Sequence, residues 1–281
     1  MRYINFNGKI LAAGTAIITA ENRGLRYGDG LFETLKFATD KLVMMDEHMA
    51  RLWKGMQEMK LKIPVHFTPD KLETQVHDLL KKNNFSYARI RISVNRGNGG
   101  LFDCEDKLHY IIECWPLTSK YTKLNDNGLD LCIFKHALKI CDRFSNLKHS
   151  NFLPYVMGSL YSQEQKCNDA IIFNQYNRVC DSTIANIFII ANETVITPPL
   201  SEGCIAGTIR KFLLQILPEL DYKVAQEIIT QEMLMEAEEV FLTNSIYNMH
   251  WVAAIGQKKY NNHISRNIFE KISRTKPHIF C

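Results

Sequence analysis

Apolar and polar side chains alternate without interruption from Ala88 to Asn95. The apolar side carries Ile90, Ile92 and Val94, and the polar side carries Arg89, Arg91, Ser93 and Asn95. Successive side chains of a β-strand point to opposite faces of its sheet, so this period predicts a strand with one buried face. The segment 109–115, beyond the glycine-rich loop 96–100, is expected to pair with it. This part of the chain should therefore form a sheet with one apolar and one polar face.

The rest of the chain mixes strand and helix signals. Asn7-Gly8 between two apolar segments predicts a hairpin at the start of the chain. Further strands are expected at 31–37, 131–134, 169–173, 184–190, 239–245 and 252–255. Helices are expected after the capping residues Asp46 and Thr68, and over 154–165, 207–216 and 231–239. These elements together predict an α/β fold.

Length and composition indicate an ordinary globular protein. The 281 residues can bury one large core or two medium ones, and we expect two domains, 1–116 and 122–281, joined by a linker at 117–121. Hydrophobic residues make up 46% and charged residues 23%, which excludes a disordered or fibrous class. The net charge of +4 is spread without blocks of like charge. Neither nucleic acid nor a membrane surface is therefore an expected partner.

The sequence shows no signal for export or for metal binding. Its first residues lack the uninterrupted apolar core of a signal peptide, and no segment reaches the roughly 18 apolar residues of a membrane helix. The eight cysteines are scattered without a Cys-x-x-Cys pair, so neither a zinc site nor a redox motif is indicated. We expect a cytoplasmic protein without a metal.

Three short motifs follow one another in the second half of the chain. Lys148 lies among small polar residues in the segment 145–151, Asp181 opens a turn rich in Ser and Asn before an apolar segment, and Gly207-Thr208 begins a helix. Each motif has an ordinary explanation on its own. A lysine is common in loops, an aspartate often bonds the backbone of its own turn, and glycine often precedes a helix.

In this order and spacing, the motifs resemble the fold-type IV pyridoxal-phosphate enzymes. That family contains branched-chain and D-amino-acid aminotransferases and 4-amino-4-deoxychorismate lyase, and the resemblance extends from near residue 1 to about residue 256. It implies a two-domain α/β fold similar to that of D-amino-acid aminotransferase, with the active site between the domains. It also implies a homodimer, pyridoxal 5'-phosphate as the cofactor and a small-molecule amino substrate.

The resemblance further implies roles for individual residues. Lys148 would form a Schiff base with the aldehyde of the cofactor and then act as a general base. Asp181 would face the pyridine nitrogen, where the family usually carries a glutamate that is one methylene longer. The phosphate would be bound by the backbone amides of Thr208 and Ile209 at a helix start, by Arg51 and by the hydroxyl of Ser245. Arg51 could instead be an ordinary surface residue of its helix.

The substrate is less clearly indicated. Thr243-Asn244-Ser245 looks like the corresponding segment of the lyases and would place Asn244 beside the substrate. The loop 96–100 also resembles the lyases, but Leu101 stands where they usually carry an arginine. Leu101 and Asp103 replace an arginine and a histidine that bind the substrate carboxylate in D-amino-acid aminotransferases, which disfavours D-amino acids. Arg91 is then the remaining candidate for a substrate carboxylate, and a structural ion pair is its alternative role.

Two reactions of this family therefore stay open. The first is 4-amino-4-deoxychorismate lyase, which yields 4-aminobenzoate and pyruvate, and the second is an amino-acid aminotransferase of the branched-chain type. A binding protein on the same fold would require that Lys148 forms no bond to the cofactor. A dehydrogenase is disfavoured because the chain lacks a glycine fingerprint between a strand and a helix.

Overall fold

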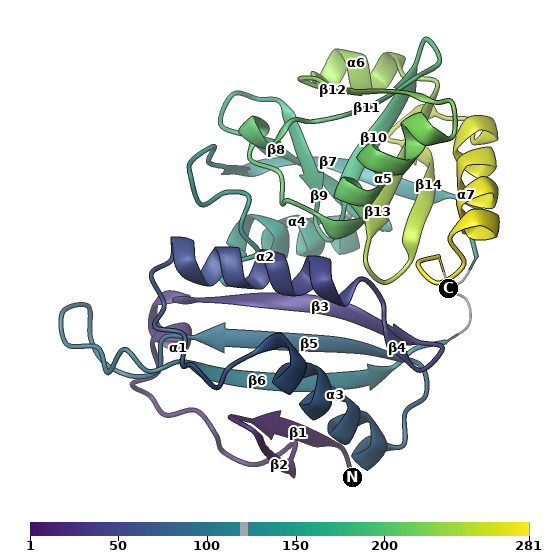
Figure 1. Ribbon diagram of the computed structural model, residues 1–281. Coiled ribbons are helices and arrows are strands. Elements are labelled where there is room, and N and C mark those ends of the chain that lie inside the picture. The colour runs from purple at the N-terminus through teal and green to yellow at the C-terminus, as the bar shows by residue number, and fades with distance from the viewer. Residues whose placement is uncertain (119–122, 281) are drawn as a thin grey trace. The chain divides into compact units, whose positions relative to one another are not determined.

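The computed structural model describes residues 1–118 and 123–280, and in it the chain forms two compact units (Figure 1). Unit 1 contains Met1–Thr118 and Leu147–Asn151, and unit 2 contains Ser119–Asn146 and Phe152–Cys281. The predicted second domain, 122–281, includes residues 147–151, whereas in the structure these residues belong to unit 1. Of the predicted linker 117–121, residues 119–121 lie outside the described ones. Each unit combines a sheet with helices, which confirms the expected α/β class.

Unit 1 is built on an antiparallel six-stranded sheet in the order β2-β1-β6-β5-β3-β4. Its strands are β1 (Tyr3–Phe6), β2 (Lys9–Ala12), β3 (Gly30–Ala38), β4 (Lys41–Leu42), β5 (Ala88–Asn95) and β6 (His109–Pro116). The predicted hairpin is confirmed, because Phe6 pairs with Lys9 across the turn. Asn7 and Gly8 have φ values of 51° and 86°, the positive values that such a two-residue turn requires.

Three helices belong to unit 1: α1 (Arg23–Tyr27), α2 (Met45–Glu58) and α3 (Pro69–Asn83). The predicted cap of α3 is confirmed, since the side chain of Thr68 accepts a hydrogen bond from the backbone N–H of Lys71. The predicted cap of α2 is wrong. Met44 precedes that helix in a left-handed conformation, and Asp46 lies inside its first turn. A carboxylate there still stabilises the helix through its dipole, which explains why the sequence pattern resembles a cap.

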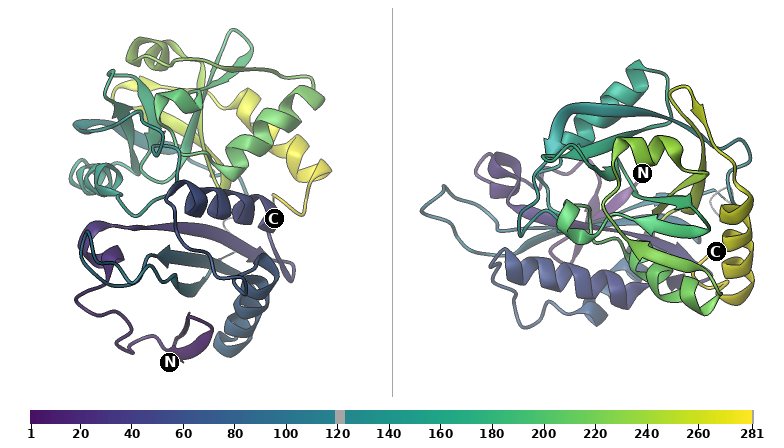
Figure 2. Two further views of the ribbon diagram at one scale, coloured as in Figure 1. Left: turned by 60° about the vertical axis from the view of Figure 1, so that its left-hand side comes forward. Right: turned by 90° about the horizontal axis from the view of Figure 1, so that it is seen from above.

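The core of unit 1 lies on the apolar face of β5. Ile90, Ile92 and Val94 are buried there, as their alternation predicts. They pack against residues of α2 and α3 that include Met49, Leu52, Met56, Leu72, Val76 and Leu79. Figure 2 shows both helices beside the first sheet from two further sides. The opposite, polar face of β5 remains for Arg89, Arg91 and Ser93.

Unit 2 contains a mixed nine-stranded sheet in the order β12-β11-β10-β13-β14-β7-β8-β9, with β15 paired to β14. The first strands are β7 (Leu129–Lys139), β8 (Asp169–Asn174), β9 (Val179–Ser182), β10 (Asn186–Ala191) and β11 (Thr194–Thr197). The others are β12 (Lys223–Gln226), β13 (Glu239–Asn244), β14 (Asn248–Ile255) and β15 (Lys258–Lys259). The predicted strand over 184–190 begins two residues before β10, because the N–H of Ser182 donates to the carbonyl of Ala185 at 2.8 Å and closes a turn through 183–185.

The helices of unit 2 are α4 (Leu153–Glu164), α5 (Thr208–Glu219), α6 (Gln231–Glu236) and α7 (His263–Thr275), with a short 3-10 helix at Leu200–Glu202. The predicted helix over 231–239 ends at Glu236, because β13 begins at Glu239. The core includes Ile171, Phe173, Ile187, Ile189, Val240 and Leu242. No described helix has the length and apolar character needed to cross a membrane.

Candidate active site

Lys148 lies in an extended segment that is fixed against the start of β3. Its carbonyl accepts a hydrogen bond from the N–H of Phe32 at 2.9 Å, and the N–H of Ser150 donates to the carbonyl of Gly30 at 2.9 Å. His149 forms a bridge with Leu31 between them. The half-buried side chain of Lys148 places Nζ 4.8 Å from the centroid of the Phe32 ring. The backbone of β3 therefore positions this lysine, although the two segments are far apart in the sequence.

Arg91 reaches the same ring from the polar face of β5. Its guanidinium carbon lies 3.8 Å from the centroid of the Phe32 ring, and its Nε donates to Ser93 Oγ at 3.1 Å. Burial, followed by the charge of Arg89, lowers the pKa of Arg91. The predicted carboxylate-binding arginine and the predicted catalytic lysine are thus brought together on one aromatic side chain.

Arg51 lies on α2 and forms a two-point ion pair with Glu33 of β3. Its Nε donates to Oε1 at 2.8 Å and its Nη2 donates to Oε2 at 2.6 Å. His48, one turn earlier on α2, places Nδ1 2.7 Å from Oε2 of the same carboxylate. Arg51 is not a plain surface residue, because this buried carboxylate fixes its orientation. Its role toward a phosphate stays a prediction.

Glu33 and His48 are polar residues that the sequence reasoning missed. Burial raises the pKa of Glu33, but the charge and hydrogen bonds of Arg51, together with His48, outweigh it and set the pKa at about 2. Burial lowers the pKa of His48, so the imidazole is neutral at neutral pH and donates Nδ1–H to Glu33. A carboxylate inside the apolar strand 31–37 is the signal that could have identified the pair.

Asp181 lies at the end of β9 in unit 2 and is fully enclosed. Its Oδ2 accepts from Tyr155 Oη at 2.8 Å and from the N–H of Ile205 at 2.9 Å, and its Oδ1 accepts from Asn186 Nδ2 at 2.8 Å. Burial raises the pKa of Asp181, and the charge of Lys139 is the largest opposing influence. The side chain is therefore not a simple turn aspartate that bonds its own loop.

The start of α5 provides a second anchoring point in unit 2. Gly207 is its capping residue and offers no side-chain hydrogen bond, so the N–H groups of the first turn, including those of Thr208 and Ile209, are not capped by it. Thr208 Oγ1 lies 3.2 Å from Ser245 Oγ, which brings two predicted phosphate-binding residues together. A Cβ at Gly207 would collide with the side-chain oxygen of Asn186, the residue that donates to Asp181. The side chain of Asn186 therefore packs against Gly207 at the start of α5 and also bonds to Asp181.

Asn244 uses its side chain to hold the turn between β13 and β14. Its Oδ1 accepts from the N–H groups of Ile246 and Tyr247 at 2.9 Å and 3.1 Å, and its Nδ2 donates to the carbonyl of Ile184 at 3.3 Å. These contacts place Ser245 at the tip of the turn, beside Thr208. The suggested contact of Asn244 with substrate stays a prediction.

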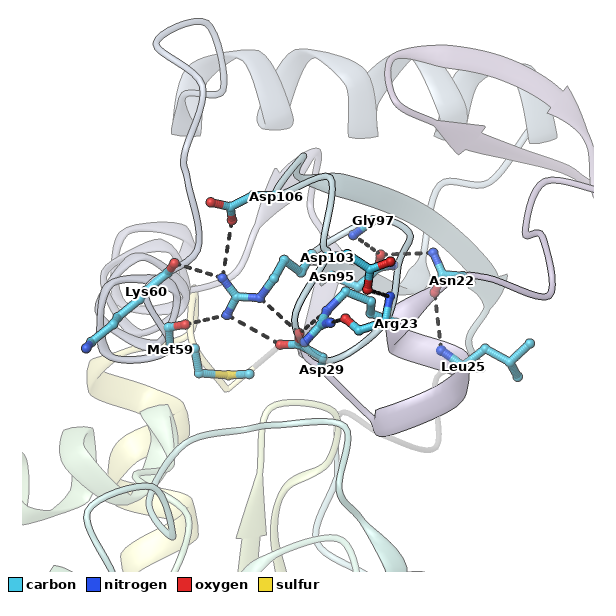
Figure 3. Close-up of polar contacts among 12 residues, drawn as sticks. Asn22, Arg23, Leu25, Asp29, Met59, Lys60, Asn95, Gly97, Asp103 and Asp106 are labelled. Atoms are coloured by element: carbon cyan, nitrogen blue, oxygen red, sulfur yellow. Dashed lines mark hydrogen bonds and ion pairs between the residues drawn. The ribbon is translucent and has the colours of Figure 1, made fainter.

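Arg96 fixes the glycine-rich loop that follows β5. Its Nε donates to Asp29 Oδ2 at 2.9 Å, and its other nitrogens donate to Asp106 and to the carbonyls of Met59 and Lys60 (Figure 3). The guanidinium is therefore engaged in holding the loop. This structural role accounts for the arginine without any contact to substrate.

The residues just beyond this loop, Leu101 and Asp103, are exposed. Leu101 is 66% exposed, and Asp103 closes the loop by accepting a hydrogen bond from the N–H of Gly100 at 3.0 Å. Neither side chain offers a cation for a substrate carboxylate. Arg51, Arg91 and Lys148 belong to unit 1, whereas Asp181, Thr208, Ile209, Asn244 and Ser245 belong to unit 2.

Comparison with known proteins identifies one family, and the similar proteins within it are named for different reactions. The family model described as amino-transferase class IV matches residues 30–255. The chain is similar to an aminodeoxychorismate lyase of Vibrio harveyi, with 27% identity over 83% of this chain and 86% of that protein. It is also similar to a D-alanine aminotransferase of Bacillus licheniformis, with 26% identity over 85% and 83%. The crystal structure of a branched-chain aminotransferase from Thermoproteus uzoniensis matches with a TM-score of 0.87 and 21% identity, over 99% of this chain and 94% of that chain.

Proposed function

This chain belongs to the class IV amino-transferase family, whose members are pyridoxal-phosphate enzymes, and we propose that it is a 4-amino-4-deoxychorismate lyase. The observation that carries the proposal is the segment Thr243-Asn244-Ser245, which resembles the corresponding segment of the lyases. Its serine hydroxyl is 3.2 Å from that of Thr208 at the start of α5. The Vibrio harveyi relative, named as a lyase, gives independent support.

The donor groups in both units suit pyridoxal phosphate. The uncapped start of α5 and the paired hydroxyls of Thr208 and Ser245 offer hydrogen bonds to a phosphate. Asp181 is a buried carboxylate, the partner that a protonated pyridine nitrogen requires. Lys148 supplies the amine that carries the cofactor's aldehyde. Arg51, oriented by Glu33, would add charge at the phosphate.

The protein's own residues then have separate tasks. When bound, the cofactor withdraws electrons from the substrate carbon that bears the amine. Lys148 takes a proton from that carbon and returns a proton to the departing three-carbon unit. Arg91, on the same Phe32 ring as Lys148, binds a substrate carboxylate and so orients the carbon toward the lysine. Because 4-aminobenzoate and pyruvate together contain every atom of the substrate, this reaction needs no second substrate.

An aminotransferase is the second candidate, and Leu101 favours it. The lyases usually carry an arginine at this position, and the exposed leucine cannot replace its charge. D-amino acids remain disfavoured, because Leu101 and Asp103 stand in place of the arginine and histidine that would bind their carboxylate. A branched-chain amino acid, with one carboxylate for Arg91, is then the alternative substrate.

The amino acceptor distinguishes the two reactions. We expect the purified enzyme to release 4-aminobenzoate, followed by its fluorescence, and pyruvate in equal amounts from 4-amino-4-deoxychorismate with no 2-oxo acid added. Lys148→Ala should abolish the release, and it serves as the control for uncatalysed breakdown. If leucine and 2-oxoglutarate are converted while 4-amino-4-deoxychorismate yields nothing, the protein is the aminotransferase.

We also propose that the enzyme is a cytoplasmic homodimer. Helix α4 exposes several large apolar side chains, Leu153, Val156, Met157 and Leu160, which suit contact with a second copy. The cysteines within residues 1–118 and 123–280 are free, which suits a reducing compartment. Light scattering during size-exclusion chromatography should give twice the chain mass of 32.5 kDa, and a mass of one chain would refute the dimer.

A further inference from the structure

The residues around the end of β7, which ends at Lys139, have an inverted burial pattern. Leu138 and Ile140 are 41% and 63% exposed, whereas Lys139 between them is only 6% exposed. A buried ammonium group loses its hydration and is costly unless nearby groups compensate it. The pairing of β7 with β8 is irregular between Phe134 and Lys139, and a reversed burial pattern of this kind is expected at functional positions.

The buried ammonium of Lys139 contacts a backbone carbonyl and an aromatic ring. Its Nζ donates to the carbonyl of Ser145 at 2.8 Å, and it lies 5.0 Å from the centroid of the Tyr155 ring. The hydroxyl of the same tyrosine donates to Asp181 Oδ2 at 2.8 Å. One aromatic side chain therefore contacts the cation through its ring and the carboxylate through its hydroxyl.

The groups that donate hydrogen bonds to Asp181 are neutral. Asn186 and the N–H of Ile205 donate to the carboxylate without carrying a charge. Burial raises the pKa of Tyr155 and of the thiols of Cys180 and Cys204, so these also stay uncharged at neutral pH. Lys139 supplies positive charge to this enclosed carboxylate, which burial would otherwise drive toward its protonated form.

We propose that Lys139 is a positioning residue that keeps Asp181 ionised, acting through Tyr155 and without touching the cofactor. The consequence for catalysis rests on the function proposed above, in which Asp181 faces the pyridine nitrogen. A protonated Asp181 could not pair with a positively charged ring nitrogen, so the ring would lose much of its power to withdraw electrons. A buried lysine so placed compensates for the deep burial of the aspartate.

The ionisation of Asp181 can be measured without the chemical reaction. We would label the aspartates of the full-length, cofactor-free protein with 13C at Cγ and follow the NMR signals against pH, with Asp181→Asn to assign the signal. Lys139→Gln is the test variant, because glutamine removes the charge but still offers a donor to the carbonyl of Ser145. Lys139→Arg is the matched control that keeps the charge.

The proposal predicts an ionised Asp181 at neutral pH in the wild type and in Lys139→Arg. In Lys139→Gln the titration midpoint should rise by about one to three pH units, the effect of removing a nearby opposite charge. An unchanged midpoint in Lys139→Gln would overturn the proposal. So would a protonated Asp181 at neutral pH in the wild type, a result that does not depend on the folding of Lys139→Gln.

Cofactor binding separates this inference from the proposed function. Pyridoxal phosphate titrated into Lys139→Gln and Asp181→Asn should bind more weakly than to the wild type in both cases. If the midpoint of Asp181 moves but Asp181→Asn binds pyridoxal phosphate like the wild type, the coupling to Lys139 is upheld. The placement of Asp181 against the pyridine nitrogen is then what fails.

Discussion

Arg91 and Lys148 place their cationic groups against the same aromatic ring, at 3.8 Å and 4.8 Å from the centroid of Phe32. Arg91 comes from the polar face of β5, and Lys148 comes from the segment that bonds to the start of β3. In the proposed function, a substrate carboxylate bound by Arg91 would lie near the amine of Lys148. The proposed role would explain why this strand arginine lies half-buried on the sheet.

Replacement of Arg91 should affect substrate binding first. Arg91→Gln removes a charge-assisted hydrogen bond worth about 1.5–3 kcal/mol, which corresponds to a decrease in kcat/KM of about ten- to a hundredfold. Most of the change should appear in KM, measured with whichever substrate is active. Arg89→Gln is the matched control, because Arg89 lies on the same face of β5 but against Trp115. Equal losses in both variants would refute the specific role of Arg91.

The ion pair of Glu33 with Arg51 should make stability depend on pH. The pKa of Glu33 is about 2 in the folded protein, below its ordinary value, so the stabilisation is present above about pH 4.5 and is lost as the pH falls toward 2. The free energy of unfolding, measured with urea, should fall between about pH 6 and about pH 3. This decrease should be about 1–3 kcal/mol larger in the wild type than in Glu33→Gln. Glu73→Gln, at an exposed position of α3, should behave like the wild type. The same pH dependence in Glu33→Gln would contradict this account.

Asp181→Asn should weaken the cofactor site. Tyr155, Ile205 and Asn186 all donate to the carboxylate, and an asparagine would point its own NH2 group at one or more of them. We expect pyridoxal phosphate to bind more weakly by about 1.5–3 kcal/mol, with a greater loss in turnover. Asp130→Asn, on the exposed part of β7, is the control. Wild-type turnover in Asp181→Asn would show that the pyridine nitrogen has another partner.

Local signals were sufficient for the elements that depend on neighbouring residues. The Asn7-Gly8 turn, the Thr68 cap and the alternation in β5 all follow from interactions within a few residues, and the structure confirms them. The cap of α2 was wrong, because Met44 adopts the left-handed conformation that precedes the helix. The strands β9, β11 and β12 were missed, since segments of four residues carry little periodic signal. Helix α7 was also missed, although Ile268, Phe269 and Ile272 follow a helical spacing that could have identified it.

The polar networks around the candidate residues could not be predicted. Glu33 and His48 are separated by 15 residues, and Tyr155 and Asp181 by 26. No local pattern connects residues so far apart, so only the fold reveals which side chains share a hydrogen bond. The family resemblance identified Lys148, Arg51 and Asp181 as candidates, but it did not indicate Lys139.

The most direct test of the account is to identify the lysine that carries the cofactor. Borohydride reduction of the yellow, cofactor-loaded enzyme, followed by digestion and mass mapping, fixes the pyridoxyl group on its lysine. The account predicts that the label lies on Lys148. Lys36 and Lys139 are more deeply buried, so burial alone would favour one of them. A label on either of these, on any other lysine, or on none would contradict the assignment of the active site.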